Sequence, residues 1–368
     1  MTVTLDQPLE LPCGATLKNR LGKSAMSETL GTTDNRVTAK LTRLYRAWAR
    51  GGTGLSVTGN VMIDRRALGE PCNVVLEDRR DMDRLKAWAR AGRENGTHLW
   101  MQINHPGKQA PAALNRETVS PSAVPFSDPN LKRFFHVPRA LTVDEIADLV
   151  RRFGETAALA KEAGFSGVQI HGAHGYLIDQ FFWSGLNDRN DRWGGPTIAD
   201  RARFGAEVVK AVREGIGEDM ALILRISQWK SHDFAARNGH DPDELAQWLA
   251  PLSEAGVDVF HGSQRRFWEP EFEGSDLNFA GWIKKLTGKP TITVGSVGLD
   301  GEFIAAFGGA GSKPASLDGL IDRLEREEFD LVAVGRALLA DPYWVQKIRD
   351  GRLDELKDFE RSALATLS

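Results

Sequence analysis

The sequence has 368 residues, of which 41% are hydrophobic and 26% are charged, and its formal net charge is −3. This composition is typical of a folded globular protein, and α/β barrels of this length form one unit, so we expect a single domain over residues 1–368. The chain lacks the basic excess of nucleic-acid-binding proteins, a leader pattern and any apolar run of about 18 residues. We therefore expect a cytoplasmic protein that binds a small molecule rather than a nucleic acid or a membrane.

Short apolar segments rich in β-branched residues recur along the chain and alternate with helical stretches. They span residues 19–26, 52–59, 97–105, 165–172, 220–227, 257–262, 289–296 and 329–336. Continuously apolar strands are typical of a parallel sheet that is covered on both faces. A helix is predicted over residues 142–164, where Thr142 and Glu145 form a capping box. Eight strands that alternate with helices predict an α/β fold of the TIM (β/α)8 barrel type.

Two long segments interrupt this repeat, at residues 105–142 and 263–279. Each follows the carboxyl end of a predicted strand, which is the end of a barrel that carries the active site. We expect them to form extra loops over that face. Their aromatic residues, such as Phe126, either shape a pocket or anchor the loops. A shorter glycine-rich insertion covers residues 307–316.

The fourth predicted strand ends in the sequence HGAHGY, residues 171–176. His171 and His174 lack the spacing and the glutamate of a helical HExxH zinc motif, so we expect no metal site. They are either buried core residues or two N–H donors that bind one carbonyl oxygen, with Tyr176 as a proton donor. Their position among glycines at a strand end favours the second interpretation.

Glycines and an arginine stand at the ends of the last two predicted strands. Gly295 and Ser296 end the seventh strand, and Gly335 and Arg336 end the eighth. Barrels often bind phosphate at this place, and an arginine can pair with phosphate through two hydrogen bonds. A solvated arginine at an ordinary strand end is the alternative, but the combination of the two strand ends favours a phosphate site.

Two polar residues lie within predicted strands that should be apolar. Gln102 is in the third strand and Arg225 is in the fifth. Buried polar groups need partners, and a buried arginine needs a negative one. An electron-rich ring that becomes anionic on reduction would serve, as would a carboxylate of the protein itself.

Several motifs resemble, in the same order and over nearly the whole chain, the FMN-dependent old yellow enzyme family, whose members reduce activated alkenes. They are GGTGL, MQINHPGKQ, PSAVPF, HGAHGYLIDQF, NDRNDRWGG (187–195), RARF (201–204) and VGRALLADP. The resemblance implies a barrel that binds FMN, takes hydride from NADPH or NADH, and passes it to the β-carbon of an unsaturated carbonyl or nitro compound in a ping-pong scheme. The absence of a GxGxxG motif agrees with a nicotinamide that binds over the flavin rather than in a Rossmann site.

The resemblance also implies the site residues. His171 and His174 bind the substrate oxygen, and Tyr176 donates the proton. The cofactor contacts are Ala25, Met26, Ser27 and Gly59 around the flavin, Gln102 at its pyrimidine edge, Arg225 at the reduced ring, and Gly295, Ser296, Gly335 and Arg336 at the phosphate. Ser27 stands where relatives carry cysteine or threonine, and Ala25 where proline is usual, so the flavin potential is left open. A monomer or a homodimer is expected.

The competing hypothesis is a flavin-free barrel, a lyase or an aldolase that uses the histidine pair for proton transfer. A Schiff-base aldolase needs a lysine within a strand, and the predicted strands offer only Lys23 near a carboxyl end. A metal-dependent lyase needs acidic residues beside the histidines, and only Asp179 follows them closely. Both alternatives are less well supported than the flavoenzyme.

Overall fold

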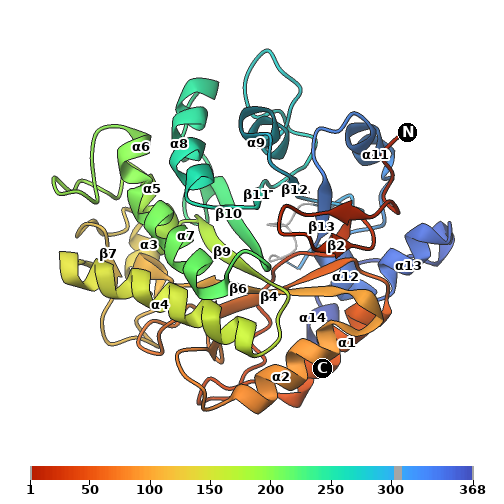
Figure 1. Cartoon of the computed structure of the whole chain (residues 1–368), viewed down its shortest axis with the longest axis horizontal. Coiled ribbons are helices and arrows are strands. Elements are labelled where there is room, and N and C mark those ends of the chain that lie inside the picture. The colour runs from red at the N-terminus through yellow and green to blue at the C-terminus, as the bar shows by residue number, and fades with distance from the viewer. Residues whose placement is uncertain (1, 302–308, 367–368) are drawn as a thin grey trace.

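A closed ring of parallel strands forms the centre of the computed structural model, which describes residues 2–301 and 309–366 (Figure 1). The strands are β3 (Leu21–Lys23), β4 (Leu55–Met62), β6 (His98–Asn104), β9 (Gly167–His174), β10 (Ala221–Lys230), β11 (Val259–Ser263), β12 (Thr291–Val294) and β13 (Leu331–Val334). Each pairs with the next, and β3 pairs with both β13 and β4, which closes the ring. The predicted TIM barrel is confirmed. A short strand, β5 (Val74–Val75), pairs with β4 in addition.

Helices surround the ring. They are α1 (Ala39–Arg50), α2 (Met82–Gly92), α4 (Val143–Glu162), α7 (Arg203–Ile216), α8 (Pro242–Glu254), α9 (Phe279–Thr287), α11 (Asp318–Glu325) and α12 (Arg336–Ala340). The helix predicted over 142–164 is α4, and the capping box of Thr142 and Glu145 is present. Its apolar face, which includes Ile146 and Phe153, is buried. Full burial of each such side chain contributes about 1.5–3 kcal/mol, so this stripe fixes the helix against the barrel.

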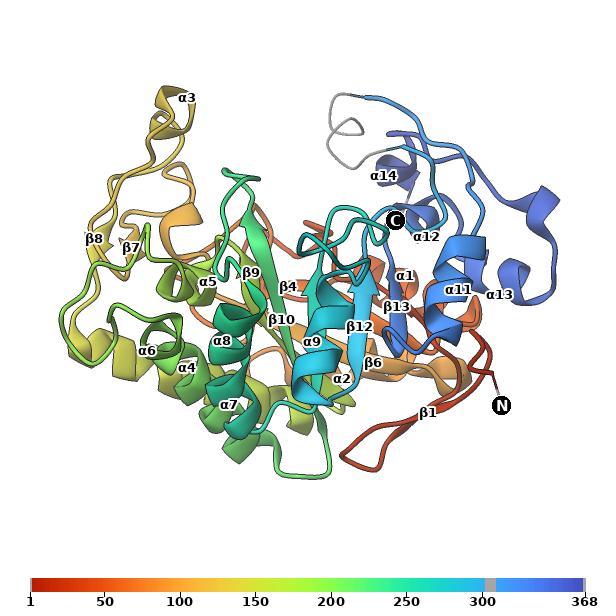
Figure 2. The ribbon, with the colours of Figure 1, turned by 90° about the horizontal axis from the view of Figure 1, so that it is seen from above.

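An antiparallel hairpin closes the amino-terminal end of the barrel. It consists of β1 (Leu9–Glu10) and β2 (Thr16–Leu17). Leu11 and Leu17 join an apolar cluster inside the strands that includes Trp100 and Ile223. Figure 2 shows the β1 segment at the opposite side of the molecule from α3 (Pro129–Lys132). This end of the barrel is therefore closed by apolar side chains, which have no catalytic groups.

The two long segments lie where they were expected, after the carboxyl ends of β6 and β11. The first contains the short elements η2 (Gly107–Gln109), β7 (Val119–Ser120), α3 and β8 (Arg139–Ala140). In Figure 2, α3 lies on the side toward which the β12 arrow points. Residues 307 and 308 of the glycine-rich insertion lie outside the described residues. Within its remainder, Ser312 and Phe359 exchange two backbone hydrogen bonds, which join the insertion to the segment near the carboxyl terminus.

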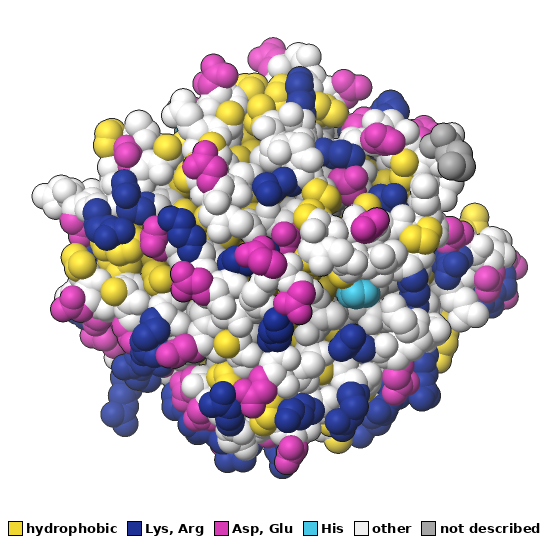
Figure 3. All heavy atoms as spheres, in the orientation of Figure 1, with side chains coloured by type: hydrophobic (Ala, Val, Ile, Leu, Met, Phe, Trp, Pro, Cys, Tyr) yellow, Lys and Arg dark blue, Asp and Glu magenta, His cyan; other side chains and the backbone are white. Residues whose placement is uncertain are grey.

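The surface carries mixed charge. On the face in Figure 3, Lys and Arg side chains are interspersed with Asp and Glu side chains. Within residues 2–301 and 309–366, no helix is long and apolar enough to cross a membrane.

Candidate active site

Alternate residues of the central strands place polar side chains inside the carboxyl-terminal half of the barrel. Side chains two residues apart point to the same face of a strand. In the amino-terminal half of the barrel the interior is apolar, as at Trp100 and Ile223. Above it the strand register sets Gln102 beside Gln169, and Arg225 beside both His171 and His261. The barrel interior therefore changes from apolar to polar along the same strands.

A chain of hydrogen bonds inside the barrel joins polar side chains of β11, β9, β6 and β4. His261 Nδ1 lies 2.9 Å from Gln169 Oε1, Gln169 Nε2 donates to Gln102 Oε1 at 2.7 Å, and Gln102 Nε2 donates to Asn60 Oδ1 at 2.8 Å. Sequence reasoning missed Gln169 and His261. The signal was available, because Gln169 stands two residues before His171 on the same strand and so shares its face.

Arg225 lies in this layer without an anion. Its side chain is buried, and its bonds are long, at 3.3 Å to Ser263 Oγ, 3.4 Å to Gln102 Oε1 and 3.5 Å to Ala25 O. Its Nε is buried and has no hydrogen-bond partner, and no carboxylate pairs with it among the described residues. Burial lowers the pKa of Arg225 to about 10, so it remains charged at neutral pH. A buried cation of this kind fits a ligand that supplies negative charge.

The two histidines at the end of β9 face each other. His171 Nε2 lies 3.2 Å from His174 Nδ1, and the ring centroids are 5.2 Å apart. His174 Nε2 lies 2.8 Å from Ser263 Oγ, whereas His171 Nδ1 is buried and has no partner among the described residues. The facing nitrogens converge on one place, so an oxygen that enters there can accept from both after their mutual bond breaks.

Both histidines are neutral at pH 7. Burial lowers the pKa of His171 and of His174 well below the usual range, and the positive charge of Arg225 lowers both further. A neutral imidazole has one N–H donor, whose position depends on the tautomer. The pair can therefore donate hydrogen bonds to a substrate oxygen without adding positive charge to the site.

The backbone of His174 is held in an unusual conformation. Its φ is +62°, a region that few non-glycine residues adopt. Its N–H donates to Ser227 Oγ at 2.9 Å, and its carbonyl accepts from Gln109 Nε2 at 2.9 Å and from Ser231 Oγ at 2.7 Å. The ring of Trp229 stacks on the imidazole with centroids 4.4 Å apart. These contacts fix the direction of the His174 side chain.

Tyr176 begins the short helix α5 (Leu177–Phe182), which follows β9 directly. Its ring centroid lies 4.6 Å from that of His171. Burial raises the pKa of Tyr176, and the charge of Glu70 raises it further. The phenol therefore keeps its proton at neutral pH, as a proton donor must. The structure thus brings the three residues of the HGAHGY motif into one group.

Lys230 corrects the sequence prediction that only Lys23 stands near a strand end. Strand β10 is longer than predicted, and Lys230 is its last residue. Its Nζ lies 2.7 Å from Asp179 Oδ1, and both side chains are fully buried. Asp179 Oδ2 also accepts from the backbone N–H of Gly175 at 2.7 Å. The ion pair is therefore engaged in holding the turn after His174, and neither member is free to react.

Lys23 is directed away from the mouth of the barrel. Its Nζ lies over the rings of Tyr45 and Trp48 of α1, at 4.7 and 4.6 Å, and donates to the Val57 carbonyl at 2.8 Å. It also bonds to Glu28 at 3.3 Å. Among the residues that the structure describes, no group of three His, Cys, Asp or Glu side chains could hold a metal ion.

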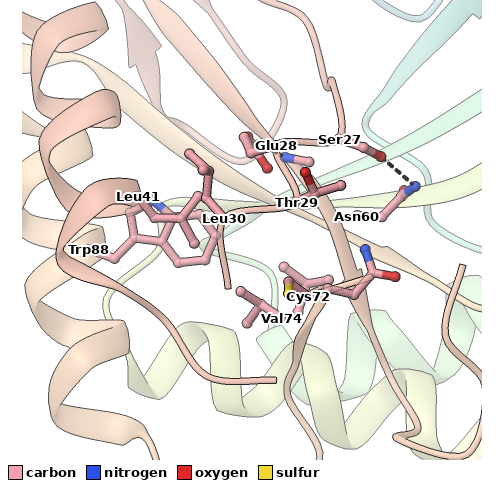
Figure 4. Close-up of a pocket in the computed structure, with 12 residues that line it drawn as sticks. Ser27, Glu28, Thr29, Leu30, Leu41, Asn60, Cys72, Val74 and Trp88 are labelled. Carbon is pink, nitrogen blue, oxygen red and sulfur yellow. Dashed lines mark hydrogen bonds between the residues drawn. The ribbon is translucent and has the colours of Figure 1, made fainter. Parts of the chain in front are cut away.

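The segment after β3 carries the first group of predicted cofactor residues. Ser27 Oγ donates to Glu70 Oε1 at 2.6 Å. It also accepts from Asn60 Nδ2 at 3.4 Å, and Figure 4 shows this second bond among the side chains that line a small pocket. A side chain at Gly59 would collide with the Glu28 carboxylate and the carbonyl of Met26. Ala25 lies within 3.5 Å of Arg225 through its carbonyl. Sequence reasoning missed Glu28, because a single glutamate in a loop has no pattern to reveal its burial.

The predicted phosphate residues directly follow the carboxyl ends of the adjacent strands β12 and β13. Gly295 and Ser296 have φ angles of +129° and +50°, and a Cβ at Gly295 would lie 2.8 Å from the Arg265 backbone. At Gly335 a Cβ would meet only Met26 Sδ, at 3.6 Å. Arg336 donates to the Gly301 carbonyl at 2.6 Å and to Ser312 Oγ at 3.2 Å.

These features fit a flavin with one phosphate. The cation of Arg225 and the amide of Gln102 lie in the barrel mouth, where they would stabilise a ring that becomes anionic. Backbone groups and one arginine follow the next two strands, where a barrel can hold one phosphate.

The chain belongs to the NADH:flavin oxidoreductase / NADH oxidase family, the old yellow enzyme family, which it matches over residues 4–355. It is 34% identical over 352 residues to an NADH oxidase of Thermoanaerobacter brockii, with 93% of this chain and 50% of that protein covered. It is 39% identical over 285 residues to the NADH-dependent flavin oxidoreductase iccE of Talaromyces variabilis, with 72% and 67% covered. Membership implies FMN as the cofactor and NADH as the reductant.

The fold agrees with a solved structure of this family. The old yellow enzyme homologue from Zymomonas mobilis superposes with a TM-score of 0.80, covers 98% of this chain and 96% of that chain, and is 21% identical. At that identity the likeness supports the barrel alone. The chain spans only half the length of the T. brockii oxidase.

Proposed function

We propose that this protein is an FMN-dependent ene-reductase that reduces the C=C bond of an α,β-unsaturated carbonyl or nitro compound. Bound FMN supplies hydride transfer, from NADH or NADPH to the β-carbon of the alkene, in a ping-pong scheme. The observation that carries the proposal is the facing pair of nitrogens on His171 and His174, with Tyr176 beside them. We also propose that residues 1–368 form one FMN-binding domain, which acts in the cytoplasm as a monomer or a homodimer.

The histidines would bind and polarise the substrate. Two N–H groups aimed at one oxygen stabilise the negative charge that develops there, which makes the β-carbon electron-poor. The Ser263 hydroxyl bonds to Nε2 of His174. If the hydroxyl donates this bond, Nε2 carries no proton, and the N–H of the neutral imidazole is at Nδ1, which faces His171. Tyr176 would then give its proton to the α-carbon.

The remaining residues would hold the cofactor. Arg225 and Gln102 would face the ring, and the ring would supply the anion that Arg225 lacks within the protein. Ser27 would have to turn its hydroxyl away from Glu70 to donate to flavin O4. The complete set of proposed cofactor residues is Ala25, Met26, Ser27, Gly59, Gln102, Arg225, Gly295, Ser296, Gly335 and Arg336.

A flavin-free lyase or aldolase is less well supported. Lys230 is ion-paired with Asp179, and Lys23 packs between β3 and α1, so neither lysine presents a free amine to the barrel mouth. The histidine pair also has no acidic neighbour that could complete a metal site among the described residues.

The histidine pair can be tested by replacing both members. We expect the double variant His171→Ala and His174→Ala to retain bound flavin. Its affinity for a phenol, whose oxygen takes the place of the substrate oxygen, should fall at least about a hundredfold. Its turnover of an enone should fall by a similar factor, as loss of oxyanion donors does. Flavin absorbance gives both the cofactor content and the phenol titration. His240→Ala, at an exposed histidine, is the matched control and should leave both unchanged. Normal phenol affinity in the double variant would contradict the proposal.

A further inference from the structure

A buried lysine without an anion stands in the segment that follows β6. Lys108 belongs to η2, directly after β6, and its residue is 2% exposed. Its Nζ lies 4.4 Å from the centroid of the Phe126 ring. No hydrogen bond or ion pair to this Nζ occurs within the part of the chain that the structure describes. An ammonium group on a buried side chain, with only an aromatic partner, retains most of its capacity to bind an anion.

The surroundings of Lys108 connect it to the proposed substrate site. The next residue, Gln109, donates to the carbonyl of His174 at 2.9 Å. The ring of Phe126 makes an edge contact with His232, with centroids 4.9 Å apart. A Cβ at Gly175, the residue after His174, would lie 3.0 Å from His232 and 3.1 Å from Gln109. Lys108, Phe126 and His232 thus form a wall against the turn that carries His174.

The charges felt within this wall are mainly positive. Burial, together with the charges of Lys108 and Lys230, lowers the pKa of His232 to about 4, and the charge of Asp233 acts in the opposite direction. Burial lowers the pKa of Lys108 itself to about 8, so the amine is still protonated at pH 7. Asp179, the acid buried nearby, already pairs with Lys230. Lys108 is therefore the cation of this group that no carboxylate contacts within the described residues.

We propose that Lys108 binds an anionic group of the substrate, so that the enzyme favours activated alkenes that carry a carboxylate. This inference rests on the proposed function and specifies its substrate class. The substrate oxygen that accepts from His171 and His174 and the carboxylate that pairs with Lys108 are then two separate groups of one molecule. Phe126 and His232 cover the apolar part between them.

Matched phenols test this inference on the oxidised holoenzyme. The probes are 3- and 4-hydroxybenzoate and the neutral amides of the same shape, 3- and 4-hydroxybenzamide, with dissociation constants measured from the flavin absorbance. We expect at least one benzoate to bind roughly ten- to a hundredfold more tightly than its amide, as a hydrogen bond between charged groups does. Lys108→Met should abolish this preference and leave amide affinity unchanged, and Lys108→Arg should retain it.

The control is Lys285→Met. Lys285 also places its Nζ over an aromatic ring, 4.3 Å from the centroid of Trp282, but it lies exposed on α9. This variant should keep the benzoate preference. Equal binding of benzoates and amides, or a preference that survives Lys108→Met, would overturn the inference and leave the proposed function intact. Binding of no phenol at all would overturn the proposed function and the inference with it.

Discussion

The two ends of the barrel are built from the same strands and hold different side chains. At the amino-terminal end Trp100, Ile223 and Leu17 fill the interior as one apolar cluster. Two residues further along the same strands stand Gln102 and Arg225, with His171 beside Arg225 on the neighbouring strand. One end therefore stabilises the fold, and the other has polar groups whose partners are incomplete. Buried groups without partners cost stability and mark the end where a ligand is expected.

The largest effect is expected at the apolar end. Trp100 is fully buried, and a Cβ at Gly167 would collide with its ring, so the site is closely packed. Trp100→Ala should lower the free energy of unfolding by about 3–5 kcal/mol through lost burial and a cavity. Urea unfolding followed by circular dichroism measures it. Trp268→Ala, at a tryptophan that is 43% exposed, should change stability by less than about 1 kcal/mol. Equal losses of unfolding free energy in the two variants would contradict the assignment of Trp100 to a closely packed core.

An intermediate effect on stability is expected from a change of pH that titrates a histidine at the polar end. His105 follows β6, is buried, and has its pKa lowered by burial to about 4. The unfolded chain takes up this proton near pH 6.5, whereas the folded chain takes it up near pH 4. Stability should therefore fall as pH drops from 6.5 to 4, by about 3 kcal/mol from this group at most.

The variant His105→Asn isolates that contribution. The asparagine oxygen can accept from the N–H of Gly107, as His105 Nδ1 does at 3.0 Å. Urea unfolding at pH 7, 6, 5 and 4 should show a smaller loss of stability in the variant than in the parent. An identical pH profile would place the acid sensitivity in other groups.

The smallest effect on stability, together with a clear effect on binding, is expected at Arg225. Arg225→Met should change the unfolding free energy of the apoprotein by less than about 1 kcal/mol, because it removes a buried charge that no carboxylate balances. It should weaken FMN binding by roughly ten- to a hundredfold, as loss of a charged hydrogen bond does. Fluorescence titration of the apoprotein with FMN measures this.

Arg213→Met provides the opposite case. Arg213 pairs with Asp258 at 2.6 Å and bonds to the carbonyls of Gly217, Met220 and Gly256. Its loss should destabilise the apoprotein and leave the affinity for FMN unchanged. If Arg225→Met lost stability and Arg213→Met lost FMN binding, the prediction that Arg225 serves the ligand and Arg213 serves the fold would be wrong.

Much of this arrangement could be predicted from local patterns. The eight apolar segments and the cap at Thr142 depend on neighbours in sequence, and both are confirmed by the barrel and by α4. Strand ends are harder to predict, because polar residues continue a strand when its neighbours satisfy them. Strand β10 thus ends at Lys230, three residues beyond its predicted end, because Asp179 forms an ion pair with Lys230 there.

The barrel, the family and the grouping of His171, His174 and Tyr176 could be predicted from the amino-acid sequence, because each rests on short motifs whose residues are close together in the chain. The pairing of polar groups could not be predicted in this way and is seen in the folded protein. The tertiary structure joined Lys230 to Asp179 and Lys23 to Glu28. It left Arg225 and Lys108 without a carboxylate among the described residues. Partnership is decided by distances between segments far apart in sequence, which appear only when the strands close into a ring.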